Sequence, residues 1–204
     1  MVGSNPENPP SASLDADHNG YNGWRIDSLR GSIDNWLTNS DPDMILLHIG
    51  TNDMLQNYQI GTLVERLDDL VGRIVLQDAH AQIFVASIIP IMQDYGGLTA
   101  AQFADMVDAY NAKIPGIVSK YALMGDNVHF VDMHNLITLT DANNPANNFF
   151  QNGDGIHPGQ AGYNQMGDIW YNAVQSSVPE PGSLTLLAVA AGMLGMRRRN
   201  GQQP

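Results

Sequence analysis

The chain has 204 residues, a formal net charge of −12 at pH 7 and no cysteine. Such an acidic chain is not expected to bind nucleic acid or an anionic membrane surface through its folded part. Without cysteine it has no disulfide, no thiolate nucleophile and no cysteine-ligated zinc. The length allows a single domain of roughly 170 residues followed by a tail, which is large enough to bury a core.

Strand and helix patterns alternate along the chain. Continuous apolar runs predict buried strands at residues 44–49, 83–89 and 128–131. Apolar residues at helical spacing predict helices at residues 63–74, 99–112 and 160–174, and Pro115 is expected to interrupt the second before a further turn through residue 121. This order predicts an α/β fold, a three-layer α/β/α sandwich with a parallel sheet, close to the flavodoxin-like arrangement.

Asp154 and His157 lie three residues apart on a short turn ahead of the last predicted helix. A neutral imidazole can take a proton from a serine hydroxyl and return it to a leaving group, while a carboxylate on its other nitrogen fixes the tautomer. The spacing therefore indicates a catalytic dyad. The same pair also fits a surface turn or half of a metal site.

Two segments upstream offer hydrogen-bond donors for such a dyad. Asn52 follows the apolar run at residues 44–49. Because ligands of open α/β sheets bind outside the carboxyl ends of the strands, its amide is expected to stabilise an oxyanion. In the glycine-rich stretch at residues 18–27, Gly23 could supply a backbone N–H as a second donor. Trp24 would either stack on a sugar as a pocket wall or fill the layer between sheet and helix.

These segments, in this order, resemble the SGNH (GDSL-like) hydrolase superfamily, with Gly23 in its second motif block, residues 50–53 in its third and residues 154–157 in its fifth. The phrases GYNGWRID, LLHIGTNDM, VASIIP, YNAKIPGIV and DGIHPGQAGY resemble carbohydrate esterase family three, the acetyl xylan esterases. The resemblance covers residues 2–173. It implies the SGNH hydrolase fold and ester hydrolysis by Ser-His-Asp acyl transfer.

One family block has no counterpart in the sequence. The resemblance places the nucleophile in a Gly-Asp-Ser at the end of the first strand, and the chain contains no Gly-Asp-Ser. Residues 3–4 lie too close to the second block to leave room for a helix and a strand, and residues 2–5 fit the end of the family's second strand. Residues 1–13 carry no export signal either. We therefore expect the first βα unit, its serine and a leader to be missing, by a mis-called start or a real loss.

The C-terminal end differs in composition from the rest of the chain. Residues 176–183 form a linker with a Pro-Glu-Pro motif, residues 184–199 an apolar run that ends in three arginines, and residues 200–204 a tail. This succession resembles the PEP-CTERM sorting tail of Gram-negative bacteria, which implies export and transient membrane anchoring by residues 184–199. An amphipathic core helix is the alternative, but the run is apolar on nearly all sides. Residues 1–175 remain as the esterase domain.

Together these features predict an exported, extracellular or cell-surface esterase that deacetylates a polysaccharide. In it, Asp154 would orient His157, while Gly23 and Asn52 would hold the oxyanion. The expected partners are an acylated carbohydrate and the membrane sorting machinery. No cofactor and no metal site is predicted, because neither His129 nor His134 shows convincing metal-ligand spacing with another His or Asp. Two other interpretations stay open: a non-catalytic surface or biofilm-matrix protein that binds carbohydrate, and a damaged gene product that folds poorly.

Four further residues are expected to be structural. His48 should be packed and hydrogen-bonded in its strand rather than catalytic. Asp53 should hold the loop after that strand. Tyr163 and Trp170 lie seven residues apart on the last helix, which places both in the core.

Overall fold

The computed structural model describes residues 5–6, 17–140, 148–150 and 154–177. The chain divides into two compact units, Met1–Trp170 and Tyr171–Pro204. Of the described residues, the second unit contains only the last turns of helix α7 (Gln160–Ser177). The predicted sorting segment at residues 184–199 lies outside the described residues. Within the described ranges, no helix is long and apolar enough to cross a membrane.

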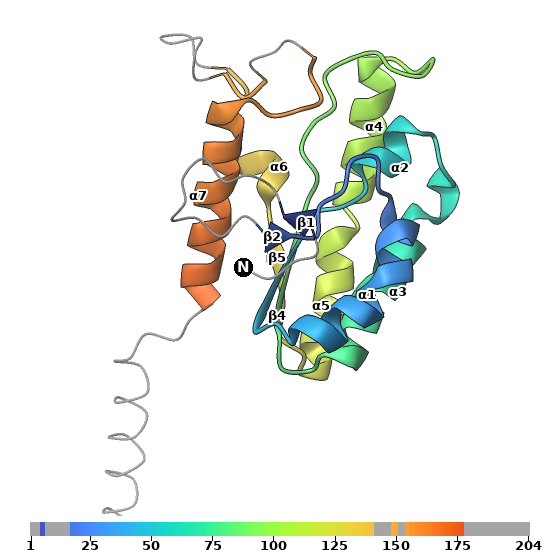
Figure 1. Ribbon diagram of the computed structural model, residues 1–204. Coiled ribbons are helices and arrows are strands. Elements are labelled where there is room, and N and C mark those ends of the chain that lie inside the picture. Colours follow the sequence, from blue (N-terminus) through green and yellow to red (C-terminus); the bar gives the residue numbers. More distant parts are fainter. Residues whose placement is uncertain (1–4, 7–16, 141–147, 151–153, 178–204) are drawn as a thin grey trace, which may run out of the picture. The chain divides into compact units, whose positions relative to one another are not determined.

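Three parallel strands form the main sheet, in the order β3 (Met44–Leu47), β4 (Gln82–Ala86) and β5 (Val128–Val131). Helices lie between these strands in the chain and pack around them (Figure 1), which confirms the predicted α/β fold with a parallel sheet. The predicted strand at residues 128–131 is reproduced within its bounds.

The other two strands, β3 and β4, end earlier than predicted. After β3, Gly50 adopts φ 125°, a conformation that ends the extended backbone. After β4, the backbone of Ile88 exchanges hydrogen bonds with the side chain of Asn111, N to Oδ1 and O to Nδ2, both at 2.9 Å. Side-chain groups thus replace the neighbouring strand as partners at the carboxyl end of the sheet.

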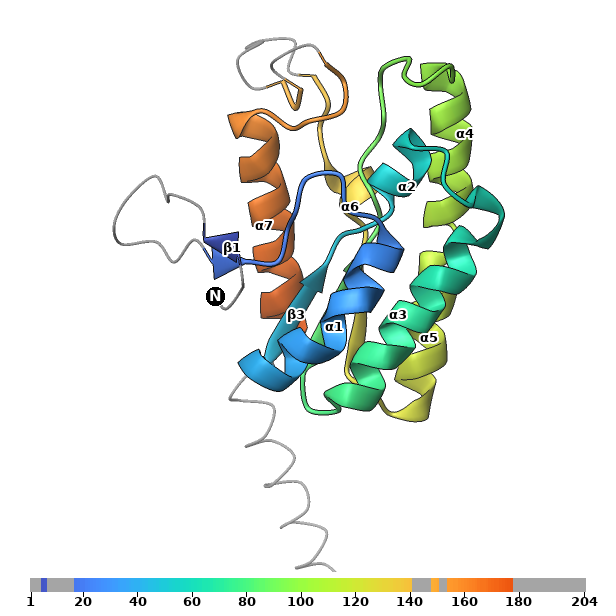
Figure 2. The ribbon, with the colours of Figure 1, turned by 45° about the vertical axis from the view of Figure 1, so that its right-hand side comes forward.

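The helices are, in chain order, α1 (Ile26–Ser40), α2 (Thr51–Leu55), the 3-10 turn η1 (Ile60–Thr62), α3 (Leu63–Gln77), α4 (Ala100–Asn111), α5 (Ile114–Met124), α6 (Met133–Leu136) and α7 (Figure 2). The three predicted helices are confirmed to within a few residues. Pro115 stands in the first turn of α5, where no intrahelical donor is lost. Helix α1 was not predicted, although Ile26, Ile33 and Leu37 line its buried face.

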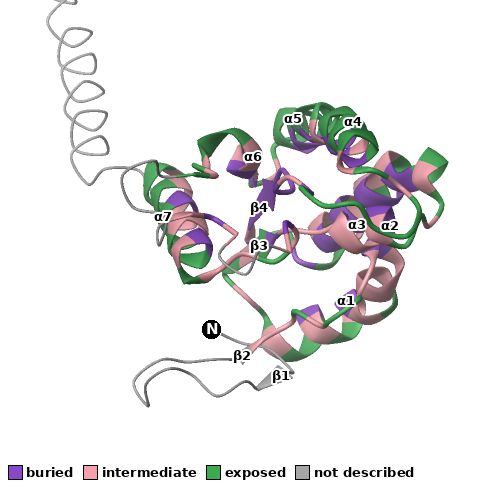
Figure 3. Ribbon diagram, turned by 90° about the horizontal axis from the view of Figure 1, so that it is seen from above, coloured by how far each residue is buried: buried purple, intermediate pink, exposed green. Residues whose placement is uncertain are grey.

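The main core lies on one face of the sheet. Ile83, Val85 and Val128 point to this face and pack in one cluster with buried side chains of α1, α3, α4 and α5. Figure 3 shows β4 buried along most of its length, with buried patches on the surrounding helices. On the opposite face Phe84 is fully buried, whereas Leu46 of β3 is 47% exposed. Within the described residues β3 pairs only with β4. The absence of a first βα unit stays a prediction.

Asn5–Pro6 (β1) pairs antiparallel with Asp17–His18 (β2) in a separate two-stranded sheet. The strand end expected at residues 2–5 falls mostly outside the described residues and stays a prediction. One expectation about a side chain is wrong. Tyr163 is 58% exposed rather than in the core. The buried side of α7 is marked by Gly162 and Ile169, seven residues apart, and the neighbouring Tyr163 is rotated away from that side.

His48, which follows β3, is packed as expected but is not hydrogen-bonded as expected. Its Nε2 atom is buried and has no hydrogen-bond partner among the described residues. Burial disfavours the charged ring and lowers the pKa of His48 from 6.5 to about 4. Between these values the unfolded chain binds the proton that the folded chain excludes. The stability that depends on neutral His48 is therefore intact above pH 6.5 and is lost as the pH falls toward 4.

We expect protonation linked to His48 to lower the free energy of unfolding by about 2 kcal/mol when the pH is lowered from 7.5 to 5.0. Urea unfolding at the two pH values measures it. A His48→Leu variant cannot take up the proton, so its loss over the same interval should be smaller by that amount. Equal losses in the wild type and the variant would show that His48 does not control acid stability.

Candidate active site

The predicted dyad is formed in the structure. Asp154 and His157 lie in the loop before α7, and the Nδ1 atom of His157 is 2.7 Å from Oδ2 of Asp154. The second carboxylate oxygen, Oδ1, accepts the backbone N–H groups of Ile156 and His157, both at 2.9 Å. The carboxylate thus holds both the turn and the ring. The His157 side chain is 70% exposed, and with Nδ1 engaged its Nε2 is the nitrogen left for a reacting group.

The electrostatics of the turn keep Asp154 ionised. The two backbone N–H donors, and then the hydrogen bond from His157, lower the pKa of Asp154 from 3.8 to about 2. At neutral pH the carboxylate is therefore a permanent negative partner for the imidazole. Such a partner fixes the tautomer that carries hydrogen on Nδ1, which leaves Nε2 free to accept a proton.

Gly155, the residue after Asp154, is required by the shape of the turn. It adopts φ 62°, and an added Cβ would lie 2.9 Å from the backbone carbonyl carbon of Met92. Met92 N donates to Gly155 O at 2.7 Å, so the turn is bound to the segment after β4. A side chain at this position would push the turn away from that segment.

Gly155→Ala should therefore raise the pKa of Asp154 from about 2 toward 3.8 and destabilise the fold by about 1–2 kcal/mol. A carboxyl NMR titration measures the first effect and urea unfolding the second. Gly167→Ala on α7 is the matched control, because an added Cβ there has no neighbour within 4 Å. An unchanged Asp154 titration in Gly155→Ala would contradict this account of the turn.

The predicted oxyanion donors also lie together. Asn52 stands in the first turn of α2, directly beyond β3, and its Nδ2 donates to the carbonyl of Trp24 at 3.0 Å. Gly23 adopts φ 75° and its carbonyl accepts from Nε2 of Gln56 at 2.9 Å. In the described part of the chain no hydrogen bond engages the N–H of Gly23. One amide hydrogen of Asn52 and this N–H are therefore left for a ligand.

Sequence reasoning missed Gln56, whose side chain supports these donors. Gln56 links Gly23 to Arg25, since its Oε1 accepts from Nη1 of Arg25 at 2.7 Å. The guanidinium of Arg25 lies 3.9 Å from the ring centroid of Tyr58. The signal available in the sequence was the position of Gln56, four residues after Asn52 and so one helical turn further on.

Asp53 supports the same loop, as the sequence predicted. Its side chain is completely buried, where Oδ1 pairs with Arg66 of α3 and Oδ2 accepts the N–H of Ile26 at 3.1 Å. Burial raises the pKa of Asp53, against the opposing effects of Arg66 and Ile26. The Asp53 carboxylate, on α2 next to Asn52, thereby connects α2 to the start of α1 and to α3.

The two halves of the site are connected through one segment. Met92 N donates to Gly155 O of the dyad turn, and an added Cβ on Gly96 would lie at ordinary contact distance, 3.5 Å, from the Leu55 carbonyl of α2. Among the described residues no hydrogen bond joins the dyad directly to Gly23 or Asn52. The segment between Met92 and Gly96 therefore lies against both halves of the site.

A nucleophile is not found beside His157. No described serine is hydrogen-bonded to its ring. Ser87, at the carboxyl end of β4, lies near a second histidine, but it is only 1% exposed and its Oγ accepts the backbone N–H of His134 at 2.9 Å. The His134 ring itself bonds to Ile88 O at 3.0 Å. Ser87 is a structural residue in this arrangement.

Trp24 belongs to a cluster of three nearly parallel rings. Its ring centroid is 4.2 Å from that of Tyr21 and 5.6 Å from that of Trp36, with interplanar angles of 22° and 10°. All three side chains are half-buried. The ring is therefore held by intramolecular stacking, and the part that remains exposed forms an apolar wall next to the Asn52 donor.

Comparisons with known proteins bear on the family of the chain. The family described as GDSL-like Lipase/Acylhydrolase matches residues 8–165, and the PEP-CTERM protein-sorting motif matches residues 177–199. Among solved structures, the Clostridium thermocellum family 3 carbohydrate esterase is 31% identical with a TM-score of 0.68. That alignment covers 86% of this chain and 76% of the other.

Two curated relatives are much longer than the matched region. A multidomain esterase of Ruminococcus flavefaciens is 27% identical over 183 residues, which is 82% of this chain and 22% of that protein. A protein of Acetivibrio thermocellus is 30% identical over 146 residues, 72% of this chain and 56% of the relative. The chain thus spans about half the length of one curated relative and about a fifth of the other. With its fold, its dyad and a family match over most of its length, the chain belongs to the GDSL-like lipase/acylhydrolase family and carries a PEP-CTERM motif.

Proposed function

We propose that the protein is an exported esterase that removes acetyl groups from a polysaccharide. The observation that carries the proposal is the 2.7 Å contact between Asp154 and Nδ1 of His157, which leaves Nε2 of His157 as a base. The chemistry is that of the family: His157 takes the proton of a serine hydroxyl as the oxygen attacks the ester carbonyl. It then gives the proton to the leaving sugar hydroxyl, and water repeats the sequence to release acetate.

Asn52 and Gly23 are proposed to hold the oxyanion of the tetrahedral intermediate. Their N–H groups flank Trp24 at the carboxyl end of β3, where the charge on the substrate oxygen would develop. Each donor of this kind typically changes the rate by about 100- to 1,000-fold. Trp24 would form one wall of the sugar subsite through its exposed edge.

The carbohydrate substrate is supported by the relatives rather than by a bound ligand. One similar structure is a family 3 carbohydrate esterase, and one similar curated protein is a multidomain esterase. We also propose residues 1–175 as the esterase domain and residues 176–183 as the linker. Residues 184–199 are proposed as the sorting helix with its basic stop, followed by the tail at 200–204. The PEP-CTERM motif at residues 177–199 supports export and handling by membrane sorting machinery, which would place the domain outside the cell or on its surface.

We further propose that the serine nucleophile is absent from these 204 residues. The sequence contains no Gly-Asp-Ser, and none of the described serines contacts His157. Hydrolysis would then depend on a preceding segment that supplies both the serine and a strand beside β3. By itself, the chain should turn over esters no faster than buffer.

A second candidate function, carbohydrate binding without hydrolysis, is favoured by the aromatic cluster of Tyr21, Trp24 and Trp36 beside the site. Such a protein would keep the sugar subsite and tolerate loss of the serine. Affinity electrophoresis in acetylated xylan distinguishes it: retardation that is lost in Trp24→Ala, together with absent turnover, supports binding as the function.

The first test is to read the genomic DNA in frame upstream of the Met1 codon and to assay the chain that it encodes. An open frame with a leader and a Gly-Asp-Ser, together with release of acetate from acetylated xylan by the longer chain, supports the esterase proposal. A stop codon there would leave binding as the candidate. Turnover of an aryl acetate by residues 1–204, abolished by His157→Ala, would refute the absence of a nucleophile.

A further inference from the structure

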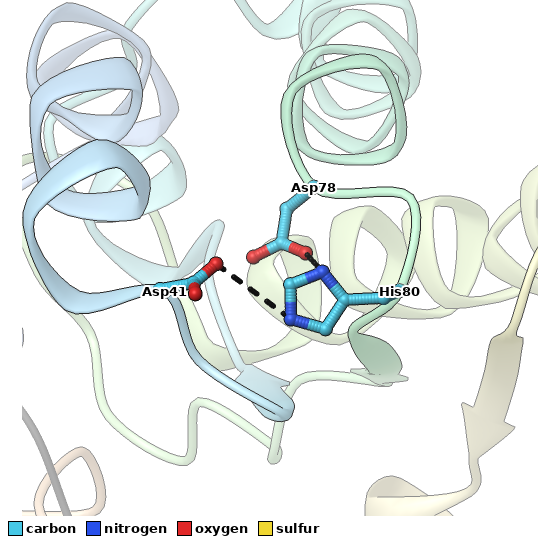
Figure 4. Close-up of side chains that lie close together, drawn as sticks. All are labelled: Asp41, Asp78 and His80. Carbon is cyan, nitrogen blue, oxygen red and sulfur yellow. Dashed lines mark ion pairs between the residues drawn. The ribbon is translucent and has the colours of Figure 1, made fainter.

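Three side chains that the sequence does not group together meet at the end of the sheet opposite to the dyad (Figure 4). Asp41 is the residue that ends α1, and Asp78 is the residue that ends α3. His80 follows in the loop that leads into β4. The strands begin here, since Gln82 N donates to Asp43 O at 2.9 Å. The cluster is thus separate from the residues assigned to ester hydrolysis.

The three side chains face one another. The Nδ1 atom of His80 is 2.9 Å from Oδ1 of Asp78, and its Nε2 atom is 3.7 Å from Oδ1 of Asp41. One donor atom from each residue can be chosen so that all three lie within 4.8 Å of one another. Two ligand atoms that are each about 2.1 Å from an ion lie at most ~4.2 Å apart. Small side-chain movements would therefore bring one donor atom of each residue within bonding distance of the same ion.

The Asp78 carboxylate has an oxygen that the protein leaves without a donor. Its side chain is only 3% exposed. Oδ1 accepts the N–H of Ala81 at 3.2 Å and contacts His80, whereas Oδ2 is buried and has no hydrogen-bond partner among the described residues. Figure 4 shows this carboxylate between Asp41 and the His80 ring. A buried carboxylate oxygen of this kind calls for a positive or hydrogen-bonding partner, because leaving it unpaired costs free energy.

The two helix ends that meet at the cluster carry no lysine or arginine in their last turns. The C-terminal end of a helix carries a partial negative charge, which cations in the last turn normally offset. Neither α1 nor α3 has a basic residue in its last turn, and an aspartate follows each of them instead. Two carboxylates and two helix ends therefore converge on one imidazole. A bound cation would neutralise all of them at once.

We propose that Asp41, Asp78 and His80 bind a divalent transition-metal ion such as zinc, which joins the C-terminal ends of α1 and α3. Two carboxylate oxygens and an imidazole nitrogen are ligands that zinc prefers, whereas calcium prefers oxygen ligands alone. Asp41 and His80 have 85% and 55% exposed side chains, so the ion would exchange with solvent and keep open positions for water. The site stabilises the fold and takes no part in ester hydrolysis.

The test is zinc binding by the full 204-residue chain, purified without a histidine tag, stripped with EDTA and titrated with zinc chloride in a calorimeter at pH 7.5. We expect one zinc per chain and a melting temperature that rises with zinc and falls again with chelator. Asp78→Asn should lower the affinity by at least about 10-fold. Should Asp78→Asn fail to fold, as judged by circular dichroism, Asp41→Asn at the exposed position replaces it with the same expected loss.

Two control variants separate this site from other histidine–carboxylate pairs. Asp108→Asn removes the partner of His134, which lies 3.6 Å from it without a third ligand, and His157→Ala removes the ring of the dyad. Both should bind zinc as the wild type does. The proposal is overturned if the wild type shows no stoichiometric zinc, if Asp78→Asn and Asp41→Asn both keep full affinity, or if His157→Ala abolishes binding. In the first case the His80 ring alone bridges the two carboxylates.

Discussion

Replacing Asp53 with alanine should lower the free energy of unfolding by about 3–5 kcal/mol. The change leaves the guanidinium of Arg66, which is 8% exposed, without its carboxylate in the interior. Arg66 keeps its Nη2 contacts with the carbonyls of Tyr58 and Gln59, at 3.1 and 3.4 Å, and a longer ion pair with Asp27 at 3.8 Å. The N–H of Ile26 at the start of α1 also loses its acceptor. Urea unfolding followed by circular dichroism measures the loss.

A matched surface pair serves as the control for this prediction. Asp69 pairs with Arg30 at 2.6 Å, but both side chains are largely solvated, so Asp69→Ala should cost less than about 1 kcal/mol. In the double variant Asp53→Leu with Arg66→Leu neither charge remains buried, and most of the lost stability should return. A cost for Asp53→Ala as small as that for Asp69→Ala would mean that the buried pair does not hold the site together.

In a chain that also carries a nucleophilic serine, His157→Ala should lower kcat by about 10⁴-fold or more, with little change in KM. The imidazole acts only when the proton moves, so its loss affects the transition state and not the binding of the ester. Asp154→Asn should reduce kcat by a similar order, because the amide no longer fixes the tautomer that the 2.7 Å contact selects. Release of acetate from an aryl acetate measures both.

His129→Phe is the control for this second prediction, because the new ring keeps the stacking of His129 on Phe84, where the centroids are 4.8 Å apart. Its kcat should match that of the parent chain. If His157→Ala retained more than a tenth of the parent rate while His129→Phe was unchanged, the dyad would not be the general base.

Trp24→Ala should instead raise KM for a polysaccharide more than for an aryl acetate, if Trp24 contacts the sugar.

The fold and the dyad were accessible from the sequence because their signals are local. An apolar run of strand length, such as residues 83–89, is buried wherever the chain places it, and helical spacing at residues 63–74 indicates which face turns inward. Asp154 and His157 lie three residues apart, so their contact needs only a turn, which Gly155 with its positive φ provides. Asn52 was found because a strand and a following polar loop also form one continuous segment.

Contacts between distant segments were not accessible in this way. Gln56 bonds to a carbonyl 33 positions earlier, and Asp41 meets His80 across 39 positions. Beyond the end of β4, the backbone N–H and carbonyl of Ile88 both bond to the side chain of Asn111, 23 residues later. No pattern in the sequence marks such pairs, because each residue is unremarkable in its own segment.

The sequence by itself determined the α/β class, the pairing of Asp154 with His157 and the sorting motif, and it predicted Gly23 and Asn52 as donors. Periodicity, short-range spacing and motif order are all properties of the linear chain. Only the tertiary structure decided that Asp53 is bound in the interior by Arg66, that His48 has a buried nitrogen without a partner, and that Asp78 meets Asp41 and His80. These outcomes depend on which helices pack together, and that choice is made by the whole core at once.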